Sequence, residues 1–147
     1  MIITFCGHST FVQNEVMNKI LYNIYTDIIS DNEAELYIGN YGSFDNFAYH
    51  CGAQYRETHK NTRLVFVTPY LTDNYIKSKT KMYHFDDIVY PDLENVPPRF
   101  AITYRNKWMI DKSDIVIAYI NRDFGGAYQS FKHAVKCKKK IINLADL

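Results

Sequence analysis

The chain has 147 residues, and its 17 basic and 16 acidic side chains give a formal net charge of +1. This length predicts one domain over residues 1–147, with one site and no separate substrate domain. A nearly neutral chain has no long-range field to attract a nucleic-acid backbone or an anionic membrane. We therefore expect neither a nucleic acid nor a membrane among its partners, and any phosphate binding must be local.

The first half of the chain alternates strands with helices. Residues 2–6 form a short apolar run, and residues 11–30 repeat apolar side chains at helical spacing, which predicts a strand followed by a helix. A second strand is expected at 36–38, a second helix at 44–60, and a third strand at 64–68, which ends before Pro69. From 70 to 98 the pattern weakens, and we expect only a short strand at 88–90.

The second half continues the alternation. Pro97 and Pro98 predict the start of a helix at 99–112, because proline is tolerated in the first turn. Residues 115–120 are an uninterrupted apolar run, typical of a central parallel strand covered on both faces. A helix at 127–138 and a strand at 141–144 follow. The whole pattern predicts an α/β fold of three layers, Rossmann-like, with a mainly parallel central sheet flanked by helices.

Cysteine and aromatic usage add three expectations. Cys6, Cys51 and Cys137 are odd in number and none belongs to a Cys-x-x-Cys pair, so neither a disulfide framework nor a metal site is indicated. Together with the lack of any apolar run of about 18 residues, this predicts a soluble protein of the reducing cytoplasm. The 13 Tyr and 9 Phe exceed what a core of this size needs, which predicts a homodimer.

Polar, glycine-rich loops follow the expected strands and should meet at one edge of the sheet. They comprise residues 7–10, 39–45, 68–70 and 121–127, and they hold five of the six glycines. Gly125 and Gly126 precede a helix, whose N–H groups and dipole favour an anion such as a phosphate. A side chain at Gly126 should therefore block the ligand and force a positive φ onto a residue that resists it.

Each candidate polar residue has two interpretations. Arg105, beside Asn106, would donate two parallel hydrogen bonds to a phosphate or pair with a carboxylate such as Asp111. His8 would contact a phosphate or act as a base, or else hydrogen-bond within its turn. Asp45 would bind a ribose hydroxyl or take part in catalysis, or else serve as a carboxylate favoured at a helix start. Cys6 is interpreted as a small buried hydrophobic residue.

Four segments in order resemble the SLOG superfamily, the Rossmann-like proteins that include the YpsA-type family, the DNA-processing protein DprA and the LOG phosphoribohydrolases. The segments are ITFCGHS, GNYGSFDNFA, RNKWMIDKSDIVIAYI and GGAYQSFKHA, and they span nearly the whole chain. GNYGSFDNFA is similar to the superfamily's Gly-x-x-Gly-x-Asp-x-x-Ala element, with Gly39, Gly42, Asp45 and Ala48 on matching positions.

The resemblance implies a nucleotide or nucleotide-derived ligand at the ends of the strands and no resident cofactor. The ligand-binding residues expected are Gly7, His8, Ser9, Gly39, Gly42, Ser43, Asp45, Arg105, Asn106, Gly125, Gly126 and Ala127. One departure bears on activity, because the Gly125–Phe131 segment lacks the second Gly-Thr pair and the Glu of the hydrolase signature. Cleavage of an N-glycosidic bond needs a carboxylate. Asp45 is the candidate catalytic residue.

Three functions fit these observations. The leading one is a sensor or signalling module that binds a nucleotide-type ligand without efficient turnover. The alternative is a hydrolase or transferase of nucleoside phosphates, with Asp45 as the carboxylate and Arg105 on the phosphate. The third is a protein–protein adaptor that uses the Tyr-rich segment 70–90.

Overall fold

Strands and helices alternate through residues 1–147 of the computed structural model. In chain order the elements are β1 (Ile2–Gly7), α1 (Glu15–Ile29), β2 (Ala34–Ile38), α2 (Ser43–Thr58), β3 (Thr62–Val67), α3 (Asp73–Thr80), β4 (Asp87–Val89), α4 (Ala101–Lys112), β5 (Ile115–Tyr119), α5 (Gly126–Lys136) and β6 (Lys140–Asn143). Short 3₁₀ helices at Pro98–Phe100 and Leu144–Asp146 precede α4 and follow β6.

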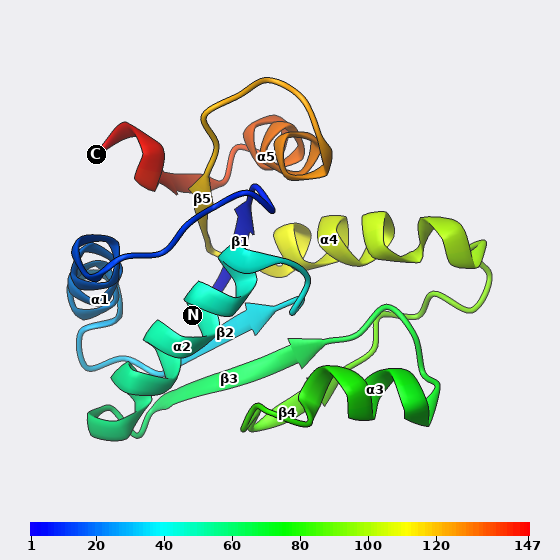
Figure 1. The fold of residues 1–147 in the computed structure, drawn as a ribbon, viewed down its shortest axis with the longest axis horizontal. Helices are drawn as coiled ribbons and strands as arrows, with labels where there is room; N and C mark the ends of the chain where they lie inside the picture. The colour runs from blue at the N-terminus through cyan, green and yellow to red at the C-terminus, as the bar shows by residue number, and fades with distance from the viewer.

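The strands form one sheet in the order β4-β3-β2-β1-β5-β6, and every neighbouring pair is parallel. Figure 1 shows β2 and β3 running in the same direction through the centre of the molecule. From β1 the chain builds the sheet outward to β4, then returns to place β5 against the other side of β1. The strand order therefore reverses between β1 and β5, and the loops that follow these two strands diverge there. The predicted three-layer Rossmann-like fold is confirmed.

Helices cover both faces of this sheet (Figure 1). On one face, buried side chains of α1 and α2 such as Tyr25 and Phe47 join a core cluster with Ile3 and Leu36 of the strands. On the other face, α4 and α5 pack together, and their buried residues contact β3 and β5. The central strands are covered on both sides, which explains their nearly continuous apolar sequences.

The residues that begin α1 account for a difference from the prediction. The helix starts at Glu15 rather than at residue 11, because the Asn14 side chain accepts a hydrogen bond from the Met17 N–H at 2.8 Å. Asn is among the preferred residues at this capping position. Phe11 lies before the helix and is buried against Phe44 and Phe47. The apolar Phe11 fits the helical spacing of the residues that follow it, so the predicted helix included it although it lies outside α1.

The helix α3 was not predicted, because none of its residues is buried. A helix that buries little apolar surface has no strong apolar periodicity to reveal it. The strand β4 lies at Asp87–Val89, one residue earlier than expected at both ends. No helix in this structure combines the length and the apolar composition that crossing a membrane requires.

Candidate functional site

A pocket of about 300 Å³ opens at the C-terminal end of β1, beside the loop that follows β5. Its floor is the end of β1 and the loop that follows, and its walls are the start of α2, one side of α4 from Ile102 to Met109, and the start of α5. Seven predicted residues line it: Gly7, His8, Ser9, Asp45, Asn106, Gly126 and Ala127. The other predicted residues, Gly39, Gly42, Ser43, Arg105 and Gly125, do not line it.

Two helices begin beside this pocket with a glycine at the capping position. Gly42 precedes α2 with φ +101°, and Gly125 precedes α5 with φ +95°. Both values lie in the region that a residue with a Cβ avoids, so glycine is required at each position. Neither helix start is capped by a side-chain hydrogen bond. The first N–H groups of both helices therefore remain open to a ligand acceptor, and the dipoles favour an anion there.

The structure corrects the expectation for Gly126. The positive φ belongs to Gly125, whereas Gly126 is the first residue of α5 and has an ordinary φ. A Cβ built on Gly126 has no heavy atom within 4 Å. A small side chain at Gly126 therefore meets open space in the pocket and does not strain the backbone.

Arg105 lies in a different place from the one expected. Its side chain is completely buried, and it donates hydrogen bonds to the carbonyl oxygens of Gly39 (3.0 Å) and Val67 (2.8 Å) and to Asn106 Oδ1 (2.9 Å). A Cβ on Gly39 would come within 2.9 Å of the Arg105 guanidinium carbon. Arg105 thus joins the ends of β2 and β3 to α4 from beneath the pocket, and Gly39 makes room for it.

Asp45 contributes a carboxylate to the pocket wall from the first turn of α2. Its Oδ2 accepts the Tyr41 N–H at 2.9 Å. Burial raises the pKa of Asp45 to about 6, although the Tyr41 hydrogen bond and the charges of Arg105 and Lys79 act in the opposite direction. This carboxyl therefore changes charge near neutrality, unlike an exposed aspartate.

His8 supplies a hydrogen-bond donor without a protein acceptor. The side chain is 2% exposed, and its Nε2 accepts the Asn121 N–H at 3.3 Å. Burial, and secondly the charge of Arg122, lowers the pKa of His8, so the ring is neutral at pH 7. Since Nε2 is the acceptor, the ring hydrogen belongs to Nδ1, which has no partner within the protein. An acceptor atom on a ligand would satisfy it.

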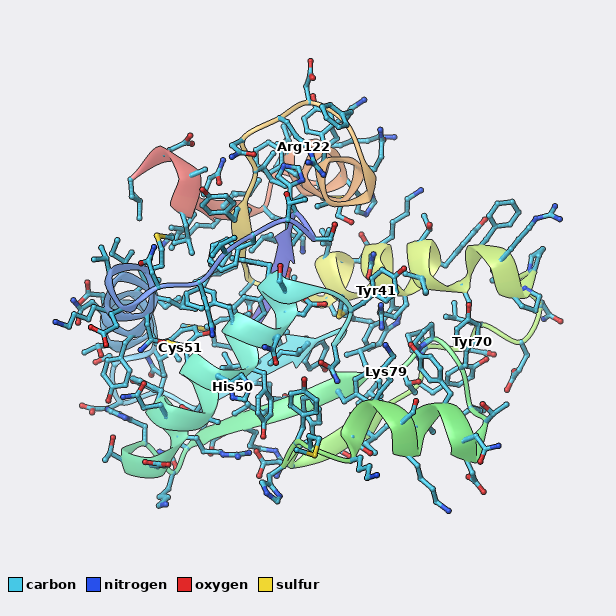
Figure 2. The ribbon with its side chains drawn as sticks, in the orientation of Figure 1. Tyr41, His50, Cys51, Tyr70, Lys79 and Arg122 are labelled. Carbon is cyan, nitrogen blue, oxygen red and sulfur yellow. The ribbon has the colours of Figure 1, made fainter.

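The positive charges of the pocket come from Lys107 and Arg122, two residues that the sequence did not single out. Arg122 lies on the loop after β5, at the top of Figure 2, and its guanidinium lies over the Phe124 ring at 4.7 Å. Its Nε is buried without a hydrogen-bond partner. In the sequence, Arg122 is only one basic residue in a polar loop after a predicted strand. Arg105 belongs to a more distinctive motif and was therefore chosen instead.

Tyr41 extends the pocket wall toward α3. It is 60% exposed, and the Lys79 ammonium lies 5.6 Å from the centre of its ring. Figure 2 shows Tyr41 and Lys79 between the start of α2 and the helix α3, with Tyr70 farther along the same side. An exposed aromatic ring with a cation beside it suits stacking on a flat, electron-rich group.

Cys6 and the two aspartates before β5 take structural positions. Cys6 is 7% exposed, and burial raises the pKa of its thiol to about 12, as expected of a buried hydrophobic residue. Asp114 accepts the Ile2 N–H at the start of β1. Asp111 pairs with His133 at 2.7 Å and not with Arg105.

Comparisons with known proteins support the fold. No family model matches the sequence, and no curated protein matches it. Among solved structures, the chain is similar to DNA processing protein A from Helicobacter pylori, described for its single-stranded DNA binding mode, with 14% identity and a TM-score of 0.63 over 96% of this chain. DNA processing protein A (DprA) from Streptococcus pneumoniae gives 11% identity and a TM-score of 0.52 over 98% of this chain. The chain spans 63% and 59% of those two chains.

The first of these structures overturns one expectation. Exclusion of a nucleic-acid partner was wrong, because a protein with this fold is described as binding single-stranded DNA. The physical error was to judge from the formal net charge, which sums over the molecule. Lys107 and Arg122 meet two open helix starts at one pocket although the whole chain carries only +1. At these identities the comparisons establish the fold alone, a Rossmann-like α/β fold that the chain shares with the two DNA processing A proteins.

Proposed function

We propose that this chain is a binding module for a nucleotide-type ligand, held in the pocket at the C-terminal end of β1, and that it acts as a sensor or signalling domain. The observation that carries the proposal is that residues with hydrogen-bond donors unpaired in the protein line one pocket. They are the first residues of α5, together with His8 and Arg122, whose buried Nδ1 and Nε have no hydrogen-bond partner. Such donors in one place favour a phosphate group.

The other walls suit the rest of a nucleotide. Asp45 accepts hydrogen bonds, as the carboxylate that contacts a ribose hydroxyl does in dinucleotide-binding folds. Tyr41 offers an exposed ring for a base. A volume of about 300 Å³ lies at the small end of ligand pockets, which favours a mononucleotide or a phosphosugar over a dinucleotide.

Thermal unfolding and calorimetry with a ligand panel test the proposal. The panel contains nucleoside monophosphates, cyclic nucleotides, NAD, ADP-ribose and phosphosugars. A ligand at 100 times its dissociation constant should stabilise the fold by about 2.7 kcal/mol. Arg122→Gln should weaken binding about tenfold or more, because a charge-assisted hydrogen bond contributes about 1.5–3 kcal/mol. Arg63→Gln, which removes an exposed arginine outside the pocket, is the matched control. No stabilisation by any panel member would refute the proposal.

Single-stranded nucleic acid is a second candidate ligand, favoured by the description of the Helicobacter pylori structure. Exposed aromatic rings at Tyr41 and Phe124 and the cations Lys79 and Arg122 border the pocket region. Proteins bind single-stranded nucleic acid by stacking its bases on aromatic rings and by placing basic groups along its backbone. Fluorescence anisotropy with a short labelled oligonucleotide would detect binding. Loss of the signal in a Tyr41→Ala, Phe124→Ala double variant supports this site, and an unchanged signal would place the strand elsewhere.

In the hydrolase alternative, Asp45 can still serve as the carboxylate, but Arg105 cannot bind the phosphate. Asp45 lines the pocket with a pKa near neutrality, as a general acid or base requires. Arg105 is committed to carbonyl oxygens beneath the pocket, so Arg122 would have to take its role. Chromatography of nucleoside monophosphates after incubation with the protein measures base release. Turnover that Asp45→Asn abolishes while ligand binding persists would establish the enzyme.

A further inference from the structure

A second group of chemically active side chains lies at the opposite edge of the sheet. Asp111 is in the last turn of α4, His133 is in the last turn of α5, and Cys137 immediately follows α5. The helices run back from the pocket toward the edge where β5 and β6 begin, so this cluster lies beyond the pocket lining, about one turn past Met109 and Ser130, and none of its residues lines the pocket. Its ligand atoms all lie within 4.8 Å of one another.

Two of the three distances within the cluster are close to those between ligands of a tetrahedral metal ion, and the third is shorter. Cys137 Sγ is 3.5 Å from His133 Nε2 and 3.7 Å from Asp111 Oδ1. Two ligands of one tetrahedral zinc lie about 3.3–3.6 Å apart, since zinc–ligand distances are about 2.0–2.3 Å. The third edge, from Nε2 to Oδ1, is 2.7 Å because the two groups share a hydrogen bond. A metal ion that replaces this hydrogen needs only a small separation of the two atoms.

The charges around the cluster also suit a divalent cation. Once metal binding has removed the thiol proton, Cys137 and Asp111 together supply two negative charges, which balance those of the ion. Both α4 and α5 end here, and the partial negative charge of a helix C-terminus attracts a cation. The carbonyl oxygens of Asp111 and Ser113 already accept the Lys139 ammonium at 3.0 and 2.9 Å. That ammonium repels a metal cation, and the two anionic ligands offset this repulsion.

We propose that Asp111, His133 and Cys137 form a zinc site that joins the ends of α4 and α5, with its fourth position open to solvent. The thiol releases its proton to water when the metal binds, and His133 binds through Nε2 as a neutral imidazole with its hydrogen on Nδ1. Thiolate, imidazole and carboxylate together form a ligand set that zinc accepts. The expectation of no metal rested on Cys-x-x-Cys spacing, which a site assembled from two helices does not show.

Cobalt(II) titration of the full chain in reducing buffer tests the site. One equivalent should produce a thiolate-to-cobalt charge-transfer absorption together with the visible bands of a tetrahedral ion, and zinc should displace both. Cys137→Ser should abolish the charge-transfer absorption. His133→Gln and Asp111→Asn should each weaken zinc binding by at least about a hundredfold, because loss of outer-shell partners alone costs about 10- to 100-fold.

Matched controls remove the same chemistry elsewhere. Cys51→Ser changes a buried thiol of α2, and His50→Gln an exposed histidine of α2; both should leave the cobalt spectrum and the zinc affinity unchanged. Circular dichroism checks that each variant folds. If Cys137→Ser does not fold, the two other variants decide the matter through zinc affinity. Cobalt binding without a thiolate absorption, or equal zinc affinity in cluster and control variants, would overturn the proposal. Pocket binding is measured separately, so neither proposal depends on the other.

Discussion

At the scale of single residues, environment decides what a polar group can do. Arg105 and Arg122 are both arginines near the ends of parallel strands, yet the first is buried on backbone carbonyls and the second lines the pocket. The sequence motif pointed to Arg105, and it did not single out Arg122, whose buried Nε has no hydrogen-bond partner. Burial and partners follow from tertiary packing, which a local pattern does not encode.

Asp45 makes stability depend on pH. Its folded pKa of about 6 lies above the ordinary aspartate value of 3.8, so its contribution to stability is most favourable below pH 3.8 and is lost as pH rises through 6. The free energy of unfolding of Asp45→Asn should therefore rise relative to that of the natural chain as the pH increases from 4 to 8. The rise should be at most about 3 kcal/mol, and less because solvent screens the carboxylate. Urea midpoints at both pH values measure this. Asp27→Asn, an exposed position on α1, is the control, and equal pH profiles of all three proteins would contradict the prediction.

The two glycines at the start of α5 should separate folding from binding. Gly125→Ala places a Cβ at φ +95° and should cost about 1–2 kcal/mol of stability. Gly126→Ala should leave stability unchanged or raise it by up to about 1 kcal/mol, because alanine favours helix and its Cβ meets nothing. Side chains at Gly126 should instead weaken ligand binding in order of size, from Ala to Val. Thermal unfolding and calorimetry on the same samples report the two effects. A Gly126→Val protein with full affinity would show that the start of α5 does not hold the ligand.

At the scale of elements, periodicity located each strand and each helix with a buried face. It missed α3, which buries no residue, and it ended strands and helices one to several residues away from the observed bounds. The strand β5 was placed correctly, because its uninterrupted apolar run has no other interpretation in an alternating pattern. The glycine loops predicted a site at the edge of the sheet where the pocket lies, whereas the charged side chains that line this pocket were found only in the structure.

The join that Arg105 makes between β2, β3 and α4 predicts a large mutational effect. Arg105→Met leaves the carbonyl oxygens of Gly39 and Val67 without this donor, and each unpaired buried group costs about 1–3 kcal/mol. We expect a loss of about 3 kcal/mol or more in the free energy of unfolding. Chemical denaturation measures it, with Arg99→Met as the exposed control before α4. A loss below about 0.5 kcal/mol would show that the join is dispensable.

At the scale of the whole molecule, the fold was predictable and the partner was not. Alternating elements fix a parallel sheet and therefore the edge at which ligands gather. Net charge, by contrast, gave the wrong answer about nucleic acid, because it averages over a surface whose cations are locally arranged. Many of the aromatic residues pack in the core, as Phe11, Phe44 and Phe47 do with one another. Fewer aromatic side chains are therefore left for a subunit interface than the homodimer prediction assumed.

The homodimer stays a prediction with a direct measurement. Val12, just before α1, is 79% exposed, and Val16, in the first turn of α1, is 66% exposed. A second copy of the chain would cover these apolar groups. Light scattering at micromolar concentration should give twice the mass of the 17.3 kDa chain. Val16→Lys should shift the equilibrium toward the monomer. A mass of one chain at all concentrations would contradict the dimer.

The open starts of α2 and α5 have a consequence for hydrogen exchange. First-turn amides without a capping side chain have no intramolecular acceptor, so their hydrogens exchange with solvent at rates close to those of an unfolded peptide. When a phosphate accepts hydrogen bonds from them, exchange at Gly126 and Ala127 should slow, while the starts of helices away from the pocket keep their rates. Amide exchange thus becomes a map of the occupied site that works before the chemical identity of its occupant is known.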